Sequence, residues 1–302
     1  MVVTEQRKVA LVTGATGFVG RHLCRRLLQE GWAVHVLLRQ GSDVDGLQQF
    51  AGVCQAHQDP VSGDLTAVLQ RSRPDVVFHL ASLFLSQHQS GDIGALLASN
   101  IGLGTRLAEA MTAVGVGGLV NTGTSWQHYN DEAFSPVNLY AASKQAFECM
   151  LRYYQEARGL RVVGLKLFDT YGPADSRGKL IELLLRHAAA GLELAMSPGG
   201  QLLDLVYISD VVEAYLQAAE YVRRGEQLGN YAVSSGAPLS LRAVAAAVEQ
   251  AVGKPLAIQW GGRPYRQREV MQPWTGGQPL PGWTPRVTLA EGLQKILDHT
   301  KI

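Results

Sequence analysis

Cysteine is scarce in this chain of 302 residues, which contains only Cys24, Cys54 and Cys149. The odd number and irregular spacing, with no CxxC pair and no Cys/His cluster, exclude a disulfide framework and a structural zinc site. Three reduced thiols are typical of a cytosolic protein, and the polar residues 1–8 lack the apolar segment of a signal peptide. We therefore expect a cytoplasmic location and no bound metal.

The chain also lacks an excess of charge of either sign and any long apolar run. Its 27 Lys and Arg residues nearly balance 26 Asp and Glu residues, so we expect no bulk electrostatic attraction to nucleic acid. The most apolar stretch, residues 180–196, is interrupted by charged and histidine side chains, so no membrane contact is expected. With 46% hydrophobic residues, the chain is typical of a globular protein with an ample core.

Hydrophobic patterning predicts alternating strands and helices in the first part of the chain. Strand, helix, strand in this rhythm indicates an α/β fold of the Rossmann type, a doubly wound parallel sheet with helices on both faces. Such sheets bind ligands beyond the carboxyl ends of their strands. The expected strands are 8–13, 33–38, 76–80, 118–121 and 161–167, and the expected helices are 21–30, 95–113 and 140–158.

The pattern changes after Tyr171, where Gly, Pro and charged residues surround isolated helices. We expect helices at 180–190 and 241–252, loops through most of 255–286, and strands at 205–208 and 231–233 that return to the main sheet. The second lobe is then discontinuous. The expected division is a cofactor-binding Rossmann domain at 1–170 and 205–235, and a smaller substrate-binding lobe at 171–204 and 236–302.

A glycine-rich turn, TGATGFVG at 13–20, connects the first strand to the first helix. Gly14 permits the tight turn, Gly17 lets the backbone approach a diphosphate, and Gly20 lets the helix pack close to the strand. The helix N-terminus adds N–H groups and the positive end of its dipole. The alternative is a purely structural turn, but the position between strand and helix favours dinucleotide binding. The turn also contributes Thr16, Phe18 and Val19 to the predicted cofactor site.

The end of the second strand indicates which dinucleotide is bound. An acidic residue there would bind the ribose 2′-hydroxyl of NAD, whereas arginine favours the 2′-phosphate of NADP. Arg39 occupies this position and Ser42 can add a donor, while Asp43 and Asp45 lie beyond the usual place of the acid. NADPH is therefore favoured, with NAD possible. The alternative for Arg39 is a solvated side chain at a strand end.

Tyr140 and Lys144 are four residues apart on a predicted helix, so their side chains share one face. A free tyrosine has a pKa of about 10 and is a poor acid at neutral pH. An ammonium group about 4 Å away favours the phenolate by about 4 kcal/mol at an effective dielectric constant of ~20. We therefore expect Lys144, helped by an oxidised nicotinamide, to lower the pKa of Tyr140 for proton transfer. Without the glycine turn, an exposed Tyr/Lys pair would be the simpler interpretation.

Hydroxyl side chains cluster directly after the expected strand 118–121, in the run Thr122-Gly-Thr124-Ser125. A hydroxyl there would lie at the carboxyl edge of the sheet, near Tyr140, and could donate to a substrate carbonyl oxygen. Alternatively, these side chains satisfy turn backbone groups. Spacing alone does not choose between Thr124 and Ser125.

Together these features resemble the extended short-chain dehydrogenase/reductases, the NAD-dependent epimerase/dehydratase family, over nearly the whole chain. The family acts on sugar nucleotides, so the resemblance implies a nucleotide-sugar substrate. Further marks of the resemblance are Gly63-Asp-Leu65, Phe78-His-Leu-Ala81, Asn100, Tyr171-Gly-Pro173, Asp204-Leu-Val-Tyr-Ile-Ser-Asp210, Gly282-Trp-Thr-Pro285 and Leu289-Ala-Glu-Gly292.

The resemblance implies roles for individual residues. Ser125 lies four residues before Tyr129, as the family's catalytic hydroxyl lies before a tyrosine, which favours Ser125 over Thr124. Tyr140 and Lys144 complete the catalytic set, and Lys144 also binds the nicotinamide ribose. Asp64 and Leu65 would flank the adenine. The remaining expected cofactor contacts are Leu80, Ala81, Ser82, Thr122 and Phe168, and the expected substrate contacts are Thr124, Ser125, Trp126, Gln127, Asp169, Lys179, Arg263 and Arg266.

Departures from the family pattern narrow the expected reaction. The 4,6-dehydratases carry Asp-Glu directly after the catalytic hydroxyl, where this chain has Trp126 and Gln127, which argues against elimination of water. The 4-epimerases keep a tightly bound NAD, whereas Arg39 favours exchangeable NADPH and net reduction. Two positions that normally help hold the substrate diphosphate are changed, to Leu203 and Asp169. We expect Arg263, Arg266 and Arg268 to replace them, with a solvated loop as the alternative.

Within the family, the sequence motifs resemble those of CDP-abequose synthase and related C4 ketoreductases. The predicted function is therefore NADPH-dependent reduction of a CDP- or dTDP-linked 4-keto-6-deoxyhexose. The alternatives are a sugar-nucleotide 4-epimerase with bound NAD and a non-catalytic NADP-sensing regulator. The resemblance also implies a homodimer through the helices that begin near Ala95 and Tyr140. For His128, a packing or hydrogen-bonding role is favoured over proton transfer.

Overall fold

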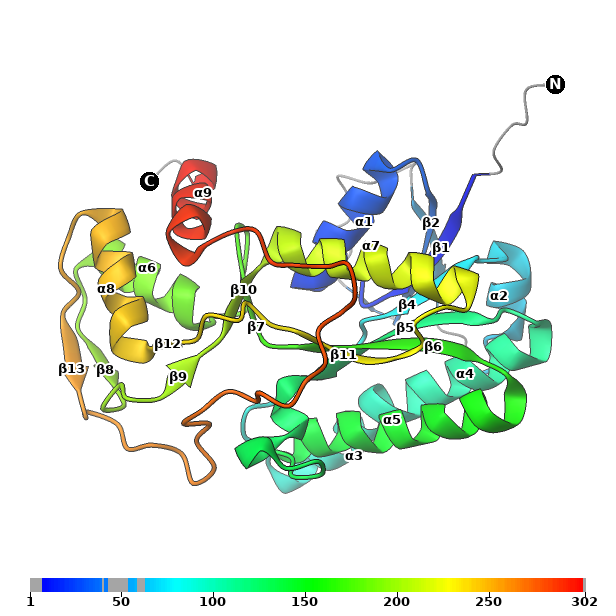
Figure 1. Ribbon diagram of the computed structural model, residues 1–302, viewed down its shortest axis with the longest axis horizontal. Helices are drawn as coiled ribbons and strands as arrows, with labels where there is room; N and C mark the ends of the chain where they lie inside the picture. Colours follow the sequence, from blue (N-terminus) through cyan, green and yellow to red (C-terminus); the bar gives the residue numbers. More distant parts are fainter. Residues whose placement is uncertain (1–6, 40, 43–53, 59–62, 301–302) are drawn as a thin grey trace.

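A seven-stranded sheet, in which all neighbouring strands are parallel, forms the centre of the fold (Figure 1). The computed structural model describes residues 7–39, 41–42, 54–58 and 63–300. The strand order is β11-β6-β5-β4-β1-β2-β3. The strands are β1 (Val9–Thr13), β2 (Ala33–Leu38), β3 (Cys54–Gln58), β4 (Val76–His79), β5 (Gly118–Thr124), β6 (Arg161–Leu167) and β11 (Gly229–Val233).

Helices cover both faces of this sheet (Figure 1). Alternate residues of β1 face opposite sides: Val12 belongs to the core beneath α1 and α7, and Leu11 to the core beneath α4 and α5. This arrangement confirms the predicted doubly wound Rossmann fold. One face carries α1 (Phe18–Gln29) and α7 (Ile208–Arg224), and the other α2 (Thr66–Ser72), α4 (Leu103–Val114) and α5 (Leu139–Arg158).

The C-terminal part of the chain adds a smaller group of elements beyond the carboxyl ends of the sheet strands, on the left of Figure 1. The expected helices at 180–190 and 241–252 are confirmed, and the segment 255–286 is mostly loop apart from one short strand. This group contains α6 (Leu180–Ala190), β8 (Leu194–Met196), β9 (Leu202–Leu203), β12 (Leu239–Ser240), α8 (Leu241–Val252), β13 (Ile258–Trp260) and α9 (Leu289–Thr300).

One strand assignment from the sequence is wrong. The segment expected at 205–208 forms β10 (Leu205–Tyr207), which does not join the main sheet but pairs in parallel with β7 (Asp169–Tyr171). The chain leaves β6 and resumes at once as β7, so β10 finds its partner outside the sheet, and Ile208 already begins α7. The other returning strand, β11, joins the main sheet as expected, and its partner there is β6.

Candidate active site

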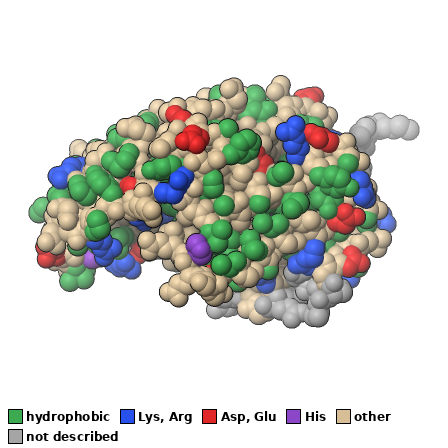
Figure 2. All heavy atoms as spheres, turned by 90° about the horizontal axis from the view of Figure 1, so that it is seen from below, with side chains coloured by type: hydrophobic (Ala, Val, Ile, Leu, Met, Phe, Trp, Pro, Cys, Tyr) green, Lys and Arg blue, Asp and Glu red, His purple; other side chains and the backbone are tan. Residues whose placement is uncertain are grey.

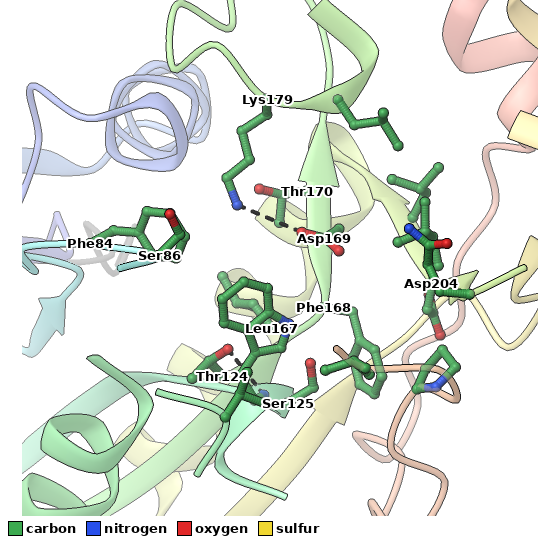
Figure 3. Close-up of a pocket in the computed structure, with 18 of the residues that line it drawn as sticks. Phe84, Ser86, Thr124, Ser125, Leu167, Phe168, Asp169, Thr170, Lys179 and Asp204 are labelled. Atoms are coloured by element: carbon green, nitrogen blue, oxygen red, sulfur yellow. Dashed lines mark hydrogen bonds and ion pairs between the residues drawn. The ribbon is translucent and has the colours of Figure 1, made fainter. Parts of the chain in front are cut away.

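A cavity of about 1120 Å³ lies between the carboxyl edge of the sheet and the C-terminal elements. In Figure 3, Thr124 and Ser125 lie on one side, Lys179 reaches toward Asp169 from the other, and Phe84 and Asp204 flank them. Many residues singled out in the sequence therefore meet in one place. They are Val19, Leu80, Ser82, Thr122, Thr124, Ser125, Trp126, Tyr140, Lys144, Phe168, Asp169, Lys179, Arg263, Arg266 and Arg268.

The glycine turn forms a backbone cradle at the start of α1. Gly14 has a left-handed φ of +71°, and a Cβ there would lie 2.6 Å from the Ala81 backbone nitrogen. A Cβ on Gly20 would lie 2.1 Å from the Gly14 carbonyl oxygen. Gly17 is exposed at the helix N-cap, whereas Phe18 is buried in the core. The cradle therefore admits only glycine at two positions and fits a bound diphosphate.

A second set of bonds fixes the loop that follows β4. Asn100 lies in a short π-helical segment, Ala98–Gly102. Its Oδ1 accepts from the Ser82 hydroxyl (3.1 Å) and the Leu83 N–H (2.7 Å), and its Nδ2 donates to the Leu83 carbonyl (3.0 Å) and the Ser143 hydroxyl (2.9 Å). Ser82 in turn hydrogen-bonds the Tyr140 phenol. Asn100 thus holds the β4 loop against α5.

Tyr140 and Lys144 lie one turn apart on α5 and both line the cavity. Burial raises the pKa of Tyr140 to about 12, an effect that the Ser82 hydrogen bond and Arg177 only partly offset. Burial also lowers the pKa of Lys144 to about 8. The expectation that Lys144 lowers the pKa of Tyr140 is therefore wrong for the chain itself, because loss of hydration disfavours both charged forms.

The Lys144 ammonium group is the clearest sign that the cavity holds a ligand. Lys144 is 2% exposed, and its Nζ has no hydrogen-bond partner among the described residues. Buried polar groups in proteins are almost always paired. The three donors of this ammonium group fit the ribose hydroxyls of a dinucleotide whose diphosphate lies on the glycine cradle.

The hydroxyls at the end of β5 differ in their partners. The strand runs to Thr124, three residues beyond the expected end. Thr122 Oγ1 hydrogen-bonds the Tyr215 hydroxyl (2.6 Å), and Thr124 Oγ1 accepts from the Trp126 N–H (3.3 Å). In the described part of the chain, no group hydrogen-bonds the Ser125 hydroxyl. Ser125 therefore keeps its donor and both acceptor positions for a ligand, whereas Thr124 keeps its O–H donor but has one acceptor position occupied.

Trp126 and Gln127, although adjacent in sequence, lie in different environments. Trp126 lines the cavity, with its ring 5.8 Å from that of Phe84. Gln127 is fully buried: its Oε1 accepts from the Thr124 N–H (3.0 Å), and its Nε2 donates to Gln145 (2.8 Å) and to Glu148 (2.7 Å). This placement corrects the prediction that Gln127 contacts the substrate, because its amide is fully used inside the protein.

His128 has no free ring nitrogen. Its Nδ1 bonds the Glu132 carbonyl (3.1 Å), and its Nε2 lies 2.7 Å from Lys166 Nζ. Because Lys166 can only donate, Nε2 accepts and the proton lies on Nδ1. His128 therefore has the hydrogen-bonding and packing role that the sequence favoured.

The residues expected to contact the adenine end of the cofactor follow β2 and β3, at one edge of the sheet. Arg39 is exposed at the end of β2, and the Ser42 N–H donates to its carbonyl (3.1 Å). Asp64 is exposed and its Oδ1 accepts from the Thr66 N–H (2.8 Å). The Leu65 side chain is buried in the core, so its backbone is the part that would flank an adenine, and this role stays a prediction. Asp43 and Asp45 lie outside the described residues.

Charged side chains from several segments line the cavity. Lys179 Nζ lies 3.6 Å from Asp169 Oδ1 and 4.7 Å from the centre of the Phe84 ring. Arg268 donates to the Ser135 hydroxyl (2.8 Å) and lies 4.2 Å from the centre of the Tyr129 ring. The exposed Arg263 and Arg266 line the same cavity. These cationic side chains can bind an anionic ligand.

Sequence reasoning missed two contributors to the site, Phe84 and Glu148. The Phe84 ring centre lies 5.0 Å from that of Tyr140, with the two rings edge to face. Glu148 follows Lys144 by one turn of α5 and bonds Gln127. The four-residue spacing from Lys144 to Glu148 was the available signal, but nothing in the sequence indicated the partner.

Two features are absent from the described residues. None of their helices is long and apolar enough to cross a membrane. They also contain no group of three His, Cys, Asp or Glu side chains that could hold a metal ion.

A Rossmann sheet with a glycine cradle and a Ser/Tyr/Lys cavity defines an enzyme of the short-chain dehydrogenase/reductase class. Residues 10–234 match the profile of the NAD dependent epimerase/dehydratase family. The chain therefore belongs to this family.

Individual relatives resemble the chain over almost its whole length. A UDP-glucose 4-epimerase of Mycolicibacterium smegmatis is 29% identical, over 95% of this chain and 97% of that protein. A CDP-abequose synthase of Salmonella muenchen is 26% identical, over 97% and 98%. The solved structure of a Thermus thermophilus UDP-glucose 4-epimerase in complex with NAD has a TM-score of 0.82 and 26% identity, over 97% and 98%.

Proposed function

We propose that the chain is an NADPH-dependent C4 ketoreductase of a nucleotide-diphosphate 4-keto-6-deoxyhexose, with CDP or dTDP as the nucleotide. The observation that carries the proposal is the meeting of Tyr140, Lys144 and the available hydroxyl of Ser125 in one cavity. The wider activity, chemistry on a sugar nucleotide, is supported by relatives that include both CDP-abequose synthases and 4-epimerases.

The cofactor proposal rests on three parts of the site. The glycine cradle would hold the diphosphate, and Lys144 would donate to the nicotinamide ribose. Arg39 and Ser42, at the end of β2, offer donors to a 2′-phosphate, which favours NADPH over NAD. When bound, the nicotinamide would supply a hydride to the C4 carbon of the sugar.

The protein's own groups act on the carbonyl oxygen. Ser125 would donate a hydrogen bond to this oxygen and orient it. Tyr140 is protonated throughout the neutral range because its pKa is about 12, so its phenol would give its proton to the oxygen as negative charge develops there. The ammonium group of Lys144, one turn away, would then stabilise the phenolate until solvent returns the proton.

The wall beside Tyr140 supports a 6-deoxy sugar. The rings of Phe84 and Trp126 form an aromatic corner next to the phenol. With C4 held at Tyr140, a neighbouring methyl group would gain apolar contact there, whereas a hydroxymethyl group would lose hydration. Trp126 also supplies no carboxylate for removing water, which supports reduction over dehydration.

The remaining proposals concern the substrate diphosphate and the organisation of the molecule. Arg263, Arg266 and Arg268 would bind the diphosphate, and Lys179 would add a further cationic contact to the substrate. The division into a cofactor domain at 1–170 and 205–235 and a substrate lobe at 171–204 and 236–302 stays a proposal. We also propose a homodimer.

The test is a panel of CDP-, dTDP- and GDP-linked 4-keto-6-deoxyhexoses, with NADPH or NADH, followed by nicotinamide absorbance and NMR of the product. We expect one equivalent of NADPH oxidised per C4 alcohol formed, and kcat/KM for NADPH above that for NADH by about tenfold or more. Tyr140→Phe should lose about 10²- to 10⁴-fold in kcat while keeping its affinity for NADPH.

Two other results would each point elsewhere. NAD that survives purification, with interconversion of C4 epimers and no net oxidation of NADPH, would identify a 4-epimerase. Saturable NADPH binding with no turnover of any keto sugar would identify a regulator instead.

A further inference from the structure

We propose that Glu148 is a positioning residue, which acts through Gln127 to hold the segment bearing Ser125 against the helix bearing Tyr140 and Lys144. The proposal rests on the function proposed above. It assigns a role to a carboxylate that lies behind the cavity wall and does not reach the reacting atoms.

The geometry of Glu148 places one carboxylate at the junction of four elements. It follows Lys144 by one turn and Tyr140 by two turns on α5, so the three side chains share one face. Its Oε2 accepts from Gln127 Nε2 (2.7 Å) and lies 3.3 Å from Lys166 Nζ on β6. Its Oε1 accepts from Asn230 Nδ2 on β11 (2.8 Å).

Gln127 links Glu148 to the segment that bears Ser125. Its Oε1 accepts from the N–H of Thr124, the residue before Ser125, at 3.0 Å. A Cβ on Gly123 would lie 2.9 Å from this Oε1 and 3.2 Å from Lys166 Cγ. The absence of a side chain at Gly123 therefore makes room for the Gln127 amide, which is fixed at both ends.

The charge of Glu148 matters as well as its hydrogen bonds. Lys166 is 5% exposed, and among the described residues Glu148 is the carboxylate that pairs with its ammonium group. The same ammonium group donates to His128, whose ring stacks on Trp274 at 4.0 Å between ring centres. Trp274 and His128 both line the cavity. Neutralising Glu148 would leave the buried ammonium group of Lys166 uncompensated. This would loosen both the segment that bears Ser125 and the stacked pair of His128 and Trp274.

The experiment compares Glu148→Gln with Glu156→Gln in the full chain. Glu156 lies on the same helix but is exposed and pairs with Arg152 (2.8 Å). We expect Glu148→Gln to lower kcat by about 10- to 100-fold, since small displacements of catalytic groups have effects of this size, with the KM and Kd for NADPH within about twofold of wild type. Glu156→Gln should match the wild type.

A double-mutant cycle separates positioning from general destabilisation. Gln127→Met should lower kcat by a similar factor, and the double variant Gln127→Met/Glu148→Gln should be no slower than the worse single variant. Additive losses would overturn the proposal. So would an unchanged kcat in Glu148→Gln, or a loss of activity that only follows the folded fraction measured by thermal unfolding.

A readout without substrate distinguishes failure of this proposal from failure of the proposed function. The imidazole of His128 faces Lys166, Glu148 and Asp131. Loss of the Glu148 charge should lower the pKa of His128, measured by NMR, while Glu156→Gln leaves it unchanged. If the wild type reduces no keto sugar, this shift still supports the linkage, and an unchanged His128 pKa in Glu148→Gln overturns it.

Discussion

At the scale of single residues, the buried ammonium group of Lys144 reduces the stability of the folded chain. Burial lowers its pKa to about 8, against an ordinary value of 10.5. Between these two pH values the unfolded chain holds more protons than the folded chain. The free energy of unfolding therefore rises with pH from about 8 to 10.5, by about 3 kcal/mol at most. Below pH 8 the full penalty of the buried charge remains.

Replacing this side chain should make the protein more stable and inactive. We expect Lys144→Met to raise the free energy of unfolding at pH 7 by about 1 to 3 kcal/mol, and to remove the rise between pH 8 and 10.5. Reduction of the keto sugar should be lost. Urea unfolding at pH 7 and pH 10 measures both effects, and the exposed Lys254→Met is the control. A variant less stable than wild type at pH 7 would contradict the prediction.

For single residues, the sequence predicted well which side chains line the cavity, and predicted poorly what surrounds each of them. The spacing of Tyr140 and Lys144 and the position of Ser125 predicted side chains that do line one cavity. The direction of the Tyr140 pKa was wrong, because it depends on burial by chain segments far away in sequence. The prediction for Gln127 failed for a related reason, because its partners Gln145 and Glu148 lie on another element, α5.

At the scale of elements, the turn between β1 and α1 tolerates little change in side-chain size. Gly20→Ala would place a methyl group 2.1 Å from the Gly14 carbonyl oxygen, so the helix or the turn must move. We expect a loss of about 1 to 3 kcal/mol in stability from overpacking. Affinity for NADPH should fall by about tenfold or more, because the shifted turn no longer fits the diphosphate.

Gly102→Ala is the matched control for this change. The nearest atom to a Cβ there is 3.8 Å away, an ordinary contact. Thermal unfolding and a fluorescence titration with NADPH measure both variants. Equal NADPH affinities in the two variants would show that the contact between turn and helix does not shape the binding site.

Regular hydrophobic patterns made most elements predictable, and their absence explains the ones that were missed. The strand β3, Cys-Gln-Ala-His-Gln, has only Cys54 and Ala56, two small side chains, as its apolar residues, so its hydrophobic pattern is weak. It is held by parallel pairing with β2 and by the stacked pair His35 and His57, whose ring nitrogens lie 2.9 Å apart. The β10 segment looked like a strand and is one, but the identity of its partner depends on topology.

At the scale of the whole molecule, exposed apolar side chains lie together on one face, where we proposed that a second copy of the chain binds. Figure 2 looks onto the side of α3 (Ile93–Leu97) and α5, where hydrophobic side chains are spread over the surface. Ile93, Leu97, Met150 and Tyr153 are all exposed there. Exposed apolar groups gathered on one face mark an interaction surface.

We expect the wild type to sediment as a dimer, and the double variant Leu97→Glu/Met150→Glu as a monomer, since facing carboxylates would be buried without partners. Analytical ultracentrifugation at micromolar concentration makes the measurement. Leu192→Glu, exposed on the C-terminal part of the molecule, is the control. A monomeric wild type, or a dimeric double variant, would rule out this face.

Helix α5 is one uninterrupted rod of 20 residues. Tyr140, Lys144 and Glu148 point inward from it at intervals of one turn, while Met150 and Tyr153 point outward from its later turns. A twist of this rod about its long axis therefore turns both sides through the same angle. Inserting or deleting a single residue between Tyr140 and Glu148 would swing one of them about 100° away from the other, so the length of this stretch is fixed by the site while its outward-facing side chains are not.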